Sequence, residues 1–168
     1  MHLRDATASD LPAIHALNQQ EVPAVGDISR ATLQWFFEHA ACLRLAEIDG
    51  AFAGFLLGLR PGLDYASPNY AWFSARYEDF FYVDRLAVAP DCRRRGVARA
   101  LYADFEAQAR AAGAPLLACE VNLRPRNDVS LAFHAAQGFA EVGRQDTDGG
   151  GKTVSMMTRP VAAHVPAR

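Results

Sequence analysis

Residues 80–113 read FFYVDRLAVAPDCRRRGVARALYADFEAQARAAG, and this stretch decides the fold. Apolar side chains fall on both faces of residues 80–88, a pattern typical of a strand that is covered on both sides. Pro90 has no N–H to donate to a strand ladder, so the strand is expected to end before it. Apolar residues at four-residue steps then predict an amphipathic helix that begins at Gly96 and is closed by Gly113.

The turn between this strand and this helix has the chemistry of an anion site. The first N–H groups of a helix have no partner within the helix, and the helix dipole makes that end positive. Gly96 and Ala98 leave room for a ligand, while Arg93, Arg94 and Arg95 add three permanent positive charges. A single glycine or a single arginine cluster is more often plain turn chemistry or a solvated surface. The combination of these features predicts a cradle for a pyrophosphate group.

Two segments resemble the signature of a known enzyme family. Residues 93–98, RRRGVA, are similar to the Arg/Gln-x-x-Gly-x-Gly/Ala motif of the GNAT superfamily of N-acetyltransferases, and the preceding LAVAP resembles the family's strand end. Residues 127–139, NDVSLAFHAAQGF, resemble the family's Asn-x-x-Ala-x-x-Phe-Tyr-x-x-x-Gly-Phe segment. Ser130 stands at the Ala position of that segment and His134 at the Tyr position. Both segments occur in the family's order and spacing.

The resemblance implies a mixed α/β, GNAT-like acyl-CoA N-acyltransferase fold. Such a fold has a mainly antiparallel central sheet with one splayed pair of parallel strands, flanked by helices. The resemblance also implies acetyl-CoA as the cofactor, with its pantetheine arm against a strand and its pyrophosphate at the arginine turn. The residues expected to contact it are Leu86, Ala87, Val88, Arg93, Arg94, Arg95, Gly96, Val97, Ala98, Arg99, Asn122, Asn127, Ser130 and Phe133.

The activity implied is direct transfer of an acetyl group to a primary amine of a small molecule or peptide, within one ternary complex. A lysine-like amine with a pKa of about 10.4 must first lose a proton, which costs roughly 4 kcal/mol near neutral pH. Asp84, two residues before the expected pantetheine contact, and Glu120, on the neighbouring strand, are the candidate bases. The alternatives are a salt bridge with a nearby arginine for Asp84 and a solvated strand end for Glu120.

His134 occupies the position at which the family commonly has a tyrosine that protonates the departing thiolate. An imidazolium with an ordinary pKa of about 6.5 donates a proton at least as readily as a phenol of about 10. His134 is therefore the candidate general acid, and a packed or surface histidine without a chemical role is the alternative. For Asn127 the alternative to a cofactor contact is capping of the next helix.

Hydrophobic periodicity extends the prediction along the chain in the order β-α-α-β-β-β-α-β-α-β-β. The expected strands are residues 2–7, 42–48, 52–59, 80–88, 115–122, 139–145 and 152–160. The expected helices are residues 9–18, 30–40, 96–113 and 127–137. Residues 60–79 have no clean period and predict a long aromatic loop, which is either a wall or lid of the acceptor site, a self-packed loop or a dimer contact.

Length and composition limit the class of protein. The 168 residues, 51% hydrophobic and 21% charged, favour one globular domain over residues 1–161 and a flexible tail at residues 162–168. A net charge of −2 argues against general nucleic-acid binding. No membrane-length apolar run and no signal-peptide pattern is present, so a cytoplasmic location and no membrane partner are expected. The three cysteines and five histidines form no metal-like cluster, so no metal is expected.

Two other functional classes stay open beside the enzyme. A non-catalytic acyl-CoA-binding module would keep the arginine turn without the acid–base groups, and the His134 substitution is compatible with it. A dinucleotide-binding domain is disfavoured, because no Gly-x-Gly-x-x-Gly follows an early strand. Glu21, Asp79 and the aromatic residues of the loop are compatible with a cationic or aromatic acceptor. The family resemblance adds the expectation of a homodimer.

Overall fold

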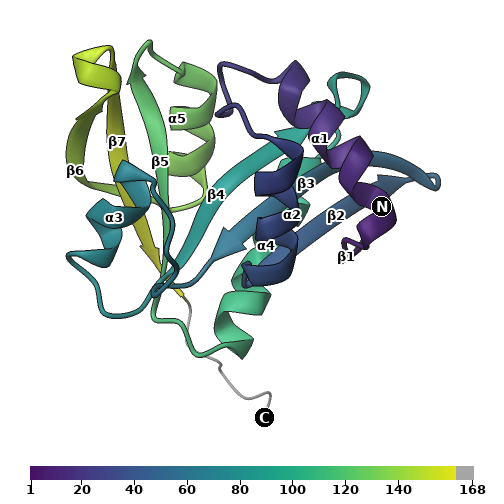
Figure 1. The fold of residues 1–168 in the computed structure, drawn as a ribbon, viewed down its shortest axis with the longest axis horizontal. Helices are drawn as coiled ribbons and strands as arrows, with labels where there is room; N and C mark the ends of the chain where they lie inside the picture. Colours follow the sequence, from purple (N-terminus) through teal and green to yellow (C-terminus); the bar gives the residue numbers. More distant parts are fainter. Residues whose placement is uncertain (162–168) are drawn as a thin grey trace. The chain divides into compact units, whose positions relative to one another are not determined.

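The computed structural model describes residues 1–161, so the tail expected at residues 162–168 lies outside the described part of the chain. Figure 1 shows the predicted order of strands and helices, with one additional helix. The strands are β1 (His2–Asp5), β2 (Cys42–Ile48), β3 (Ala51–Leu59), β4 (Phe81–Val88), β5 (Leu116–Arg124), β6 (Ala140–Thr147) and β7 (Lys152–Pro160). The helices are α1 (Leu11–Gln20), α2 (Arg30–His39), α3 (Pro68–Ser74), α4 (Val97–Ala111) and α5 (Asp128–Ala136). Three short 3-10 turns are η1 (Ala8–Asp10), η2 (Pro90–Cys92) and η3 (Asp148–Gly150).

The strands form a seven-stranded sheet in the order β1-β2-β3-β4-β5-β7-β6. The pairs β1–β2, β2–β3, β5–β7 and β6–β7 are antiparallel. Strand β4 pairs with β5 in parallel, and the pairing covers only Phe81 with Leu117 and Tyr82 with Ala118. This arrangement confirms the predicted fold class, a mixed α/β fold with a mainly antiparallel sheet and one parallel pair.

The chain forms two compact units, which share the strand β4. Among the described residues, the first unit contains residues 1–60 and 83–108, and the second contains residues 61–82 and 109–161. The prediction of a single domain is not decided by this division and stays a prediction. Within residues 1–161, no helix is both long enough and apolar enough to cross a membrane.

Local turn and cap signals are the part of the fold that the sequence predicts best. The β2–β3 hairpin turns at Asp49 and Gly50, whose φ angles of 53° and 77° are those of a type I′ turn. Ser29 caps α2 by accepting a hydrogen bond from Thr32 N at 3.0 Å. Gly113, with a φ of 72°, follows the end of α4 as expected.

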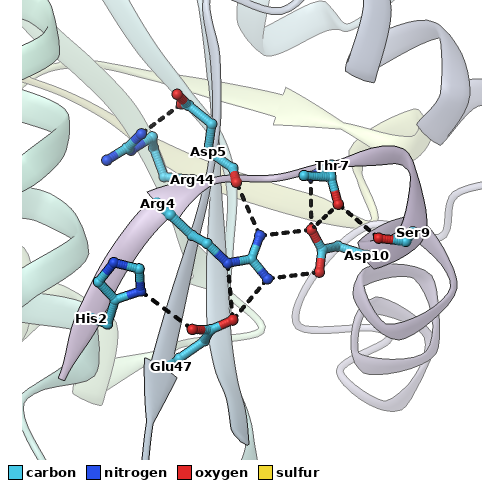
Figure 2. Close-up of polar contacts among 8 residues, drawn as sticks. All are labelled: His2, Arg4, Asp5, Thr7, Ser9, Asp10, Arg44 and Glu47. Atoms are coloured by element: carbon cyan, nitrogen blue, oxygen red, sulfur yellow. Dashed lines mark hydrogen bonds and ion pairs between the residues drawn. The ribbon is translucent and has the colours of Figure 1, made fainter. Parts of the chain in front are cut away.

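A polar network around Arg4 anchors the start of α1 in the first unit (Figure 2). Arg4 donates to the two carboxylate oxygens of Asp10 at 2.8 and 2.9 Å and to Glu47 at 2.7 and 2.9 Å. Thr7 caps the 3-10 turn η1, and both its N–H and its hydroxyl donate to Asp10 at 2.7 Å. The hydrogen bonds from Arg4 hold the pKa values of both carboxyls below their ordinary range. The helix predicted from residue 9 therefore begins at Leu11, after a 3-10 turn that is capped by Thr7.

Helix α4 is fixed on the sheet of the first unit by close packing and by a buried ion pair. A Cβ atom on Gly58 of β3 would lie 2.4 Å from the Phe105 ring and 2.8 Å from Cys42 Sγ, so a side chain there has no room. Arg44 of β2, whose side chain is 10% exposed, donates to Asp104 of α4 at 2.6 and 3.0 Å. These contacts set the direction in which the first turn of α4 points.

Helix α3 is the largest departure from the sequence prediction, which expects a loop throughout residues 60–79. Ser67 Oγ accepts a hydrogen bond from Tyr70 N at 3.2 Å, and Pro68 is the first helical residue. Within the second unit α3 packs on β6, since a Cβ on Gly143 would lie 2.5 Å from the Trp72 ring. The loop prediction is therefore wrong for the seven residues of α3. Ser67 and Pro68 form a typical helix start, but the aromatic residues that follow show no regular alternation of apolar and polar residues at helical spacing.

Candidate active site

The turn after β4 has the geometry of an anion cradle. Arg94 and Gly96 have positive φ angles, 61° and 82°, and a Cβ atom on Gly96 would meet nothing within 4 Å. The first bond of helix α4 runs from Ala100 N to Gly96 O at 2.9 Å. In the described part of the chain, no acceptor pairs with the backbone N–H groups of residues 94–99. Free N–H groups at a helix N-terminus, with open space above them, fit a pyrophosphate.

The three arginines of the cradle differ in their surroundings. Arg93 forms contacts within the protein: its guanidinium pairs with Glu21, and its Nε donates a hydrogen bond to Val88 O at 3.4 Å. Arg95 lies 4.0 Å from Asp49, in a pair whose side chains are 50% and 93% exposed. Arg94 and Arg99 are exposed. The exposed positive charge beside the cradle that could contact a ligand therefore comes chiefly from Arg94, Arg95 and Arg99.

The strand that leads into the cradle lies against β3. Ala89 N donates to Ala53 O at 2.9 Å, just beyond the end of β4. A Cβ on Gly54 would lie 2.6 Å from Ala87 O and 3.2 Å from Val88 Cα, so the two backbones approach closely there. Ala87 is buried, whereas Leu86 and Val88 are half-buried. The three predicted pantetheine contacts are thus on a strand whose position is fixed by its neighbour.

Asp84, one of the two candidate bases, forms a buried ion pair in the first unit. Its Oδ2 accepts a hydrogen bond from Arg85 Nε at 2.7 Å, and the two side chains are 3% and 8% exposed. Arg85 also donates to Asn18 Oδ1 at 2.9 Å and to Gly26 O at 3.1 Å. The structure therefore contains the salt bridge expected as the alternative for Asp84, and the catalytic role of Asp84 stays a prediction.

Glu120, the other candidate base, has a neutral partner in the second unit. Its Oε2 accepts a hydrogen bond from the Tyr82 hydroxyl at 2.7 Å. Glu120 is half-buried on β5, on the same strand face as Ala118 and Asn122. Unlike the guanidinium of Arg85, the Tyr82 hydroxyl adds no positive charge to the carboxylate to which it donates.

His134, the candidate general acid, is buried at 8% exposure on α5. Its Nδ1–H donates to Ser130 O at 2.7 Å, and its ring has edge-to-face contacts with Phe133 and Phe139. Burial lowers the pKa of His134 below its usual value, although the Ser130 carbonyl partly opposes that shift. At neutral pH His134 is therefore an uncharged imidazole, and a role as general acid requires that it first take up a proton.

The buried state of His134 predicts a pH-dependent stability. Unfolded histidine, with a pKa of about 6.5, binds a proton more readily than the buried ring, so the free energy of unfolding falls as pH drops below that value. We expect wild type to lose up to about 1 kcal/mol more than His134→Phe between pH 7.5 and 5.5. Urea unfolding at several pH values measures this difference, with Phe133→Leu as the non-titrating control. Equal pH slopes in wild type and His134→Phe would contradict the buried neutral imidazole.

The other residues of the second unit that are predicted to contact the cofactor lie near the start of α5, where hydrogen bonds join several of them. Asn127 caps this helix, since its Oδ1 accepts from Ser130 N at 3.0 Å. Asn127 N donates to Asn122 O at 3.0 Å, and the Ser130 hydroxyl lies 3.3 Å from His134 Nδ1. Phe133 is half-buried. The structure thus brings Asn122, Asn127, Ser130 and His134 together, and capping is the role it gives to the Asn127 side chain.

Comparison with known families agrees with this geometry. A family model described as "Acetyltransferase (GNAT) family" matches residues 11–139. The chain therefore belongs to the acetyltransferase (GNAT) family, as the two motifs predict. It is an acyltransferase, and acetyl-CoA, the predicted cofactor, is the acetyl donor of that family. A comparison with curated protein sequences finds no significant match.

Solved structures share the fold at low sequence identity. The ribosomal-protein-S18-alanine N-acetyltransferase of Escherichia coli is 19% identical, with a TM-score of 0.73 and coverage of 98% of this chain and 96% of that one. The structure of yncA from Salmonella typhimurium with its cofactor acetyl-CoA is 17% identical, with a TM-score of 0.70 and coverage of 100% and 98%. Naa20 of Chaetomium thermophilum, in complex with a bisubstrate analogue, is 21% identical, with a TM-score of 0.74 and coverage of 96% and 87%.

Proposed function

We propose that this acyltransferase moves the acetyl group of acetyl-CoA directly to a primary amine of a small molecule or peptide. The observation that carries the proposal is the cradle at residues 93–99, with its free N–H groups and uncommitted arginines. The coenzyme supplies an acetyl thioester, whose carbonyl carbon accepts the amine and whose sulfur leaves. One of the similar structures, the Escherichia coli enzyme, is named for an alanine of a ribosomal protein, and this supports an amine of peptide type.

Direct transfer is supported by the state of the cysteines. Burial raises the pKa of the Cys42 thiol to about 12, so it is protonated at neutral pH. Cys119 is also buried. Neither thiol is an accessible thiolate that would take the acetyl group onto the enzyme. Cys92, the third cysteine, is half-buried in η2, so burial excludes an acetyl-cysteine intermediate at Cys42 and Cys119 only. Direct transfer to the amine within a ternary complex is otherwise what the family resemblance implies.

Of the two candidate bases, Glu120 is the better supported. The Asp84 carboxylate already neutralises Arg85 in a buried pair, whereas Glu120 accepts from a neutral hydroxyl and is half-buried. Glu120 takes the ammonium proton, directly or through water, and the C–N bond forms as the C–S bond breaks. His134, once protonated, gives a proton to the departing thiolate, and this step becomes less favourable as pH rises. The homodimer and the cytoplasmic location remain predictions from the sequence.

The test of this proposal is Glu120→Gln, which keeps the shape of the side chain and removes its basicity. We expect kcat/KM for acetyl transfer to fall by about 10²-fold, the lower end of what a general base contributes. Thiol release from acetyl-CoA measures the rate across amino acids, polyamines, aminoglycosides and peptides. Calorimetric affinity for coenzyme A is expected to stay unchanged, and Glu38→Gln on the exposed face of α2 is the control.

Two outcomes would contradict the proposal. Full activity of Glu120→Gln would remove Glu120 as the base and leave Asp84 or water in that role. Tight binding of coenzyme A by wild type, with no thiol release for any amine of the panel, would favour the acyl-CoA-binding module over the enzyme.

A further inference from the structure

We infer that Tyr82 is a positioning residue, which holds the Glu120 carboxylate in its working orientation. The inference rests on the proposed function, in which Glu120 is the base. Its observation is the hydrogen bond of 2.7 Å from the Tyr82 hydroxyl to Glu120 Oε2. Neither sequence motif contains Tyr82, which lies ahead of both.

Strand register explains why these two side chains meet. Tyr82 pairs with Ala118 in the parallel β4–β5 ladder. Glu120 lies two residues beyond Ala118 on the same face of β5, a displacement of about 6.6 Å along the strand. A tyrosine side chain is long enough to span this offset, so its hydroxyl reaches the carboxylate while its ring stays over the start of the ladder. The contact is therefore built from two strands rather than from mobile loops.

Aromatic packing fixes the direction of the Tyr82 hydroxyl. Tyr82 is 1% exposed, and its ring centroid lies 5.8 Å from that of Tyr70 and 5.7 Å from that of Phe73. A ring enclosed in this way cannot change rotamer without displacing its neighbours. The position of the Tyr82 hydroxyl is therefore fixed by the packing of its ring against Tyr70 and Phe73. The hydroxyl in turn orients the Glu120 carboxylate through its hydrogen bond.

The hydrogen bond acts on both the geometry and the charge of Glu120. Binding of Oε2 to Tyr82 sets the plane of the carboxylate and hence the direction of the second oxygen, Oε1. A hydroxyl that donates to a carboxylate stabilises its charged form. Without the donor, the side chain gains rotamers in which neither oxygen points in the required direction. We therefore expect Tyr82 to affect turnover and not the binding of the coenzyme.

A double-mutant cycle between Tyr82→Phe and Glu120→Gln tests the inference. Tyr82→Phe removes only the hydroxyl and is expected to lower kcat by about tenfold, the net worth of a hydrogen bond to a charged group. KM for acetyl-CoA is expected to stay within about twofold, because the cradle is untouched. In the Glu120→Gln background, Tyr82→Phe is expected to have no further effect on kcat, because its action passes through the lost carboxylate.

Tyr70→Phe is the matched control from the same aromatic core. Tyr70 is 3% exposed, and its hydroxyl accepts a hydrogen bond from Leu63 N at 3.0 Å. The same atom is deleted at a comparable depth, so any general loosening of the aromatic core appears in both variants. Only Tyr82→Phe is expected to lower kcat and to move the acidic limb of the pH profile toward higher pH.

The outcomes separate this inference from the proposed function. Loss of activity in Glu120→Gln together with full kcat in Tyr82→Phe would overturn the role of Tyr82 alone. An equal, multiplicative loss of kcat by Tyr82→Phe in both backgrounds would also overturn it, since that result indicates a purely structural effect. If wild type transfers acetyl to no amine, the coupling between Tyr82→Phe and Glu120→Gln is measured from the urea concentrations at the unfolding midpoints of the same four proteins. Additive midpoint shifts would then show that the two side chains are not coupled, and non-additive shifts would support the contact.

Discussion

Replacing Arg94 and Arg95 together by glutamate is expected to weaken the binding of coenzyme A by about 300-fold at low ionic strength. Two unit charges about 7 Å apart in water-like surroundings interact by about 0.6 kcal/mol. The double replacement changes the local charge by four units, and about two negative charges on the diphosphate oppose it, giving about 5 kcal/mol before screening. Salt reduces this to about 3.4 kcal/mol when the Debye length is about 20 Å, which corresponds to the stated change in Kd.

Arg93 is left unchanged in this variant because of its ion pair with Glu21. Replacing Arg93 would free the Glu21 carboxylate and disturb the segment that follows α1, so a loss of affinity would have two causes. Isothermal titration calorimetry of coenzyme A measures the effect, and a pantetheine analogue without phosphates is the ligand control. Arg30→Glu, at the exposed start of α2, is the control for a charge reversal outside the cradle, and it changes the net charge by two units, half the change in the double variant.

An unchanged affinity in the double variant would contradict the cradle and, with it, the proposed function. A loss of affinity for coenzyme A and pantetheine alike would also contradict it, since pantetheine has no diphosphate to repel. The expected result is a large loss for coenzyme A alone, and the loss shrinks as salt is added.

The fold could be predicted from the sequence because its decisive signals are local. The strand before Pro90, the two strands at residues 42–48 and 52–59, and the helix that begins at Arg30 each depend on residues close in sequence. These elements are correct to within a few residues. Helix α3 was not predictable from periodicity, because its residues do not divide into a polar face and an apolar face. Its aromatic side chains are instead held by tertiary contacts within the second unit, such as the contact of Trp72 with Gly143 of β6.

The candidate site could be predicted only as far as its residues belong to the two motifs. The free N–H groups at the cradle follow from the strand–turn–helix order, and the cap at Asn127 follows from its place before α5. The pairing of Arg93 with Glu21 and of Tyr82 with Glu120 joins residues 72 and 38 positions apart. No local pattern signals such contacts. Burial of His134, and hence its uncharged state, likewise depends on tertiary packing.

The contrast between Asp84 and Glu120 shows this limit most clearly. Both are acidic residues on adjacent strands, and the sequence gives no reason to prefer one as the base. The structure separates them by their partners, a buried guanidinium for Asp84 and a tyrosine hydroxyl for Glu120. Glu120→Gln should therefore lower the rate of turnover, whereas Asp84→Asn should lower the free energy of unfolding.

Asp84→Asn is expected to lower the free energy of unfolding by about 3–5 kcal/mol, the usual effect of removing one partner of a buried ion pair. The remaining Arg85 guanidinium, 8% exposed, would keep its charge without its anion. Arg85 also holds Asn18 and the Gly26 carbonyl, so the segment after α1 should loosen as well. Urea unfolding measures the loss, and hydrogen exchange at residues 21–29 measures the loosening.

A second variant separates the charge effect from packing. In Asp84→Asn with Arg85→Met, the buried cation is replaced by an apolar side chain, and stability is expected to return to within about 1–2 kcal/mol of wild type. Asn18→Ala removes one further contact of Arg85 while leaving the ion pair intact, and a smaller loss is expected there. If Asp84→Asn kept the stability of wild type and instead abolished acetyl transfer, Asp84 would be the base and Glu120 would lose that role. A stable Asp84→Asn enzyme with normal turnover would contradict a stabilising role for the buried ion pair, because removing one partner of such a pair is expected to cause a measurable loss of stability.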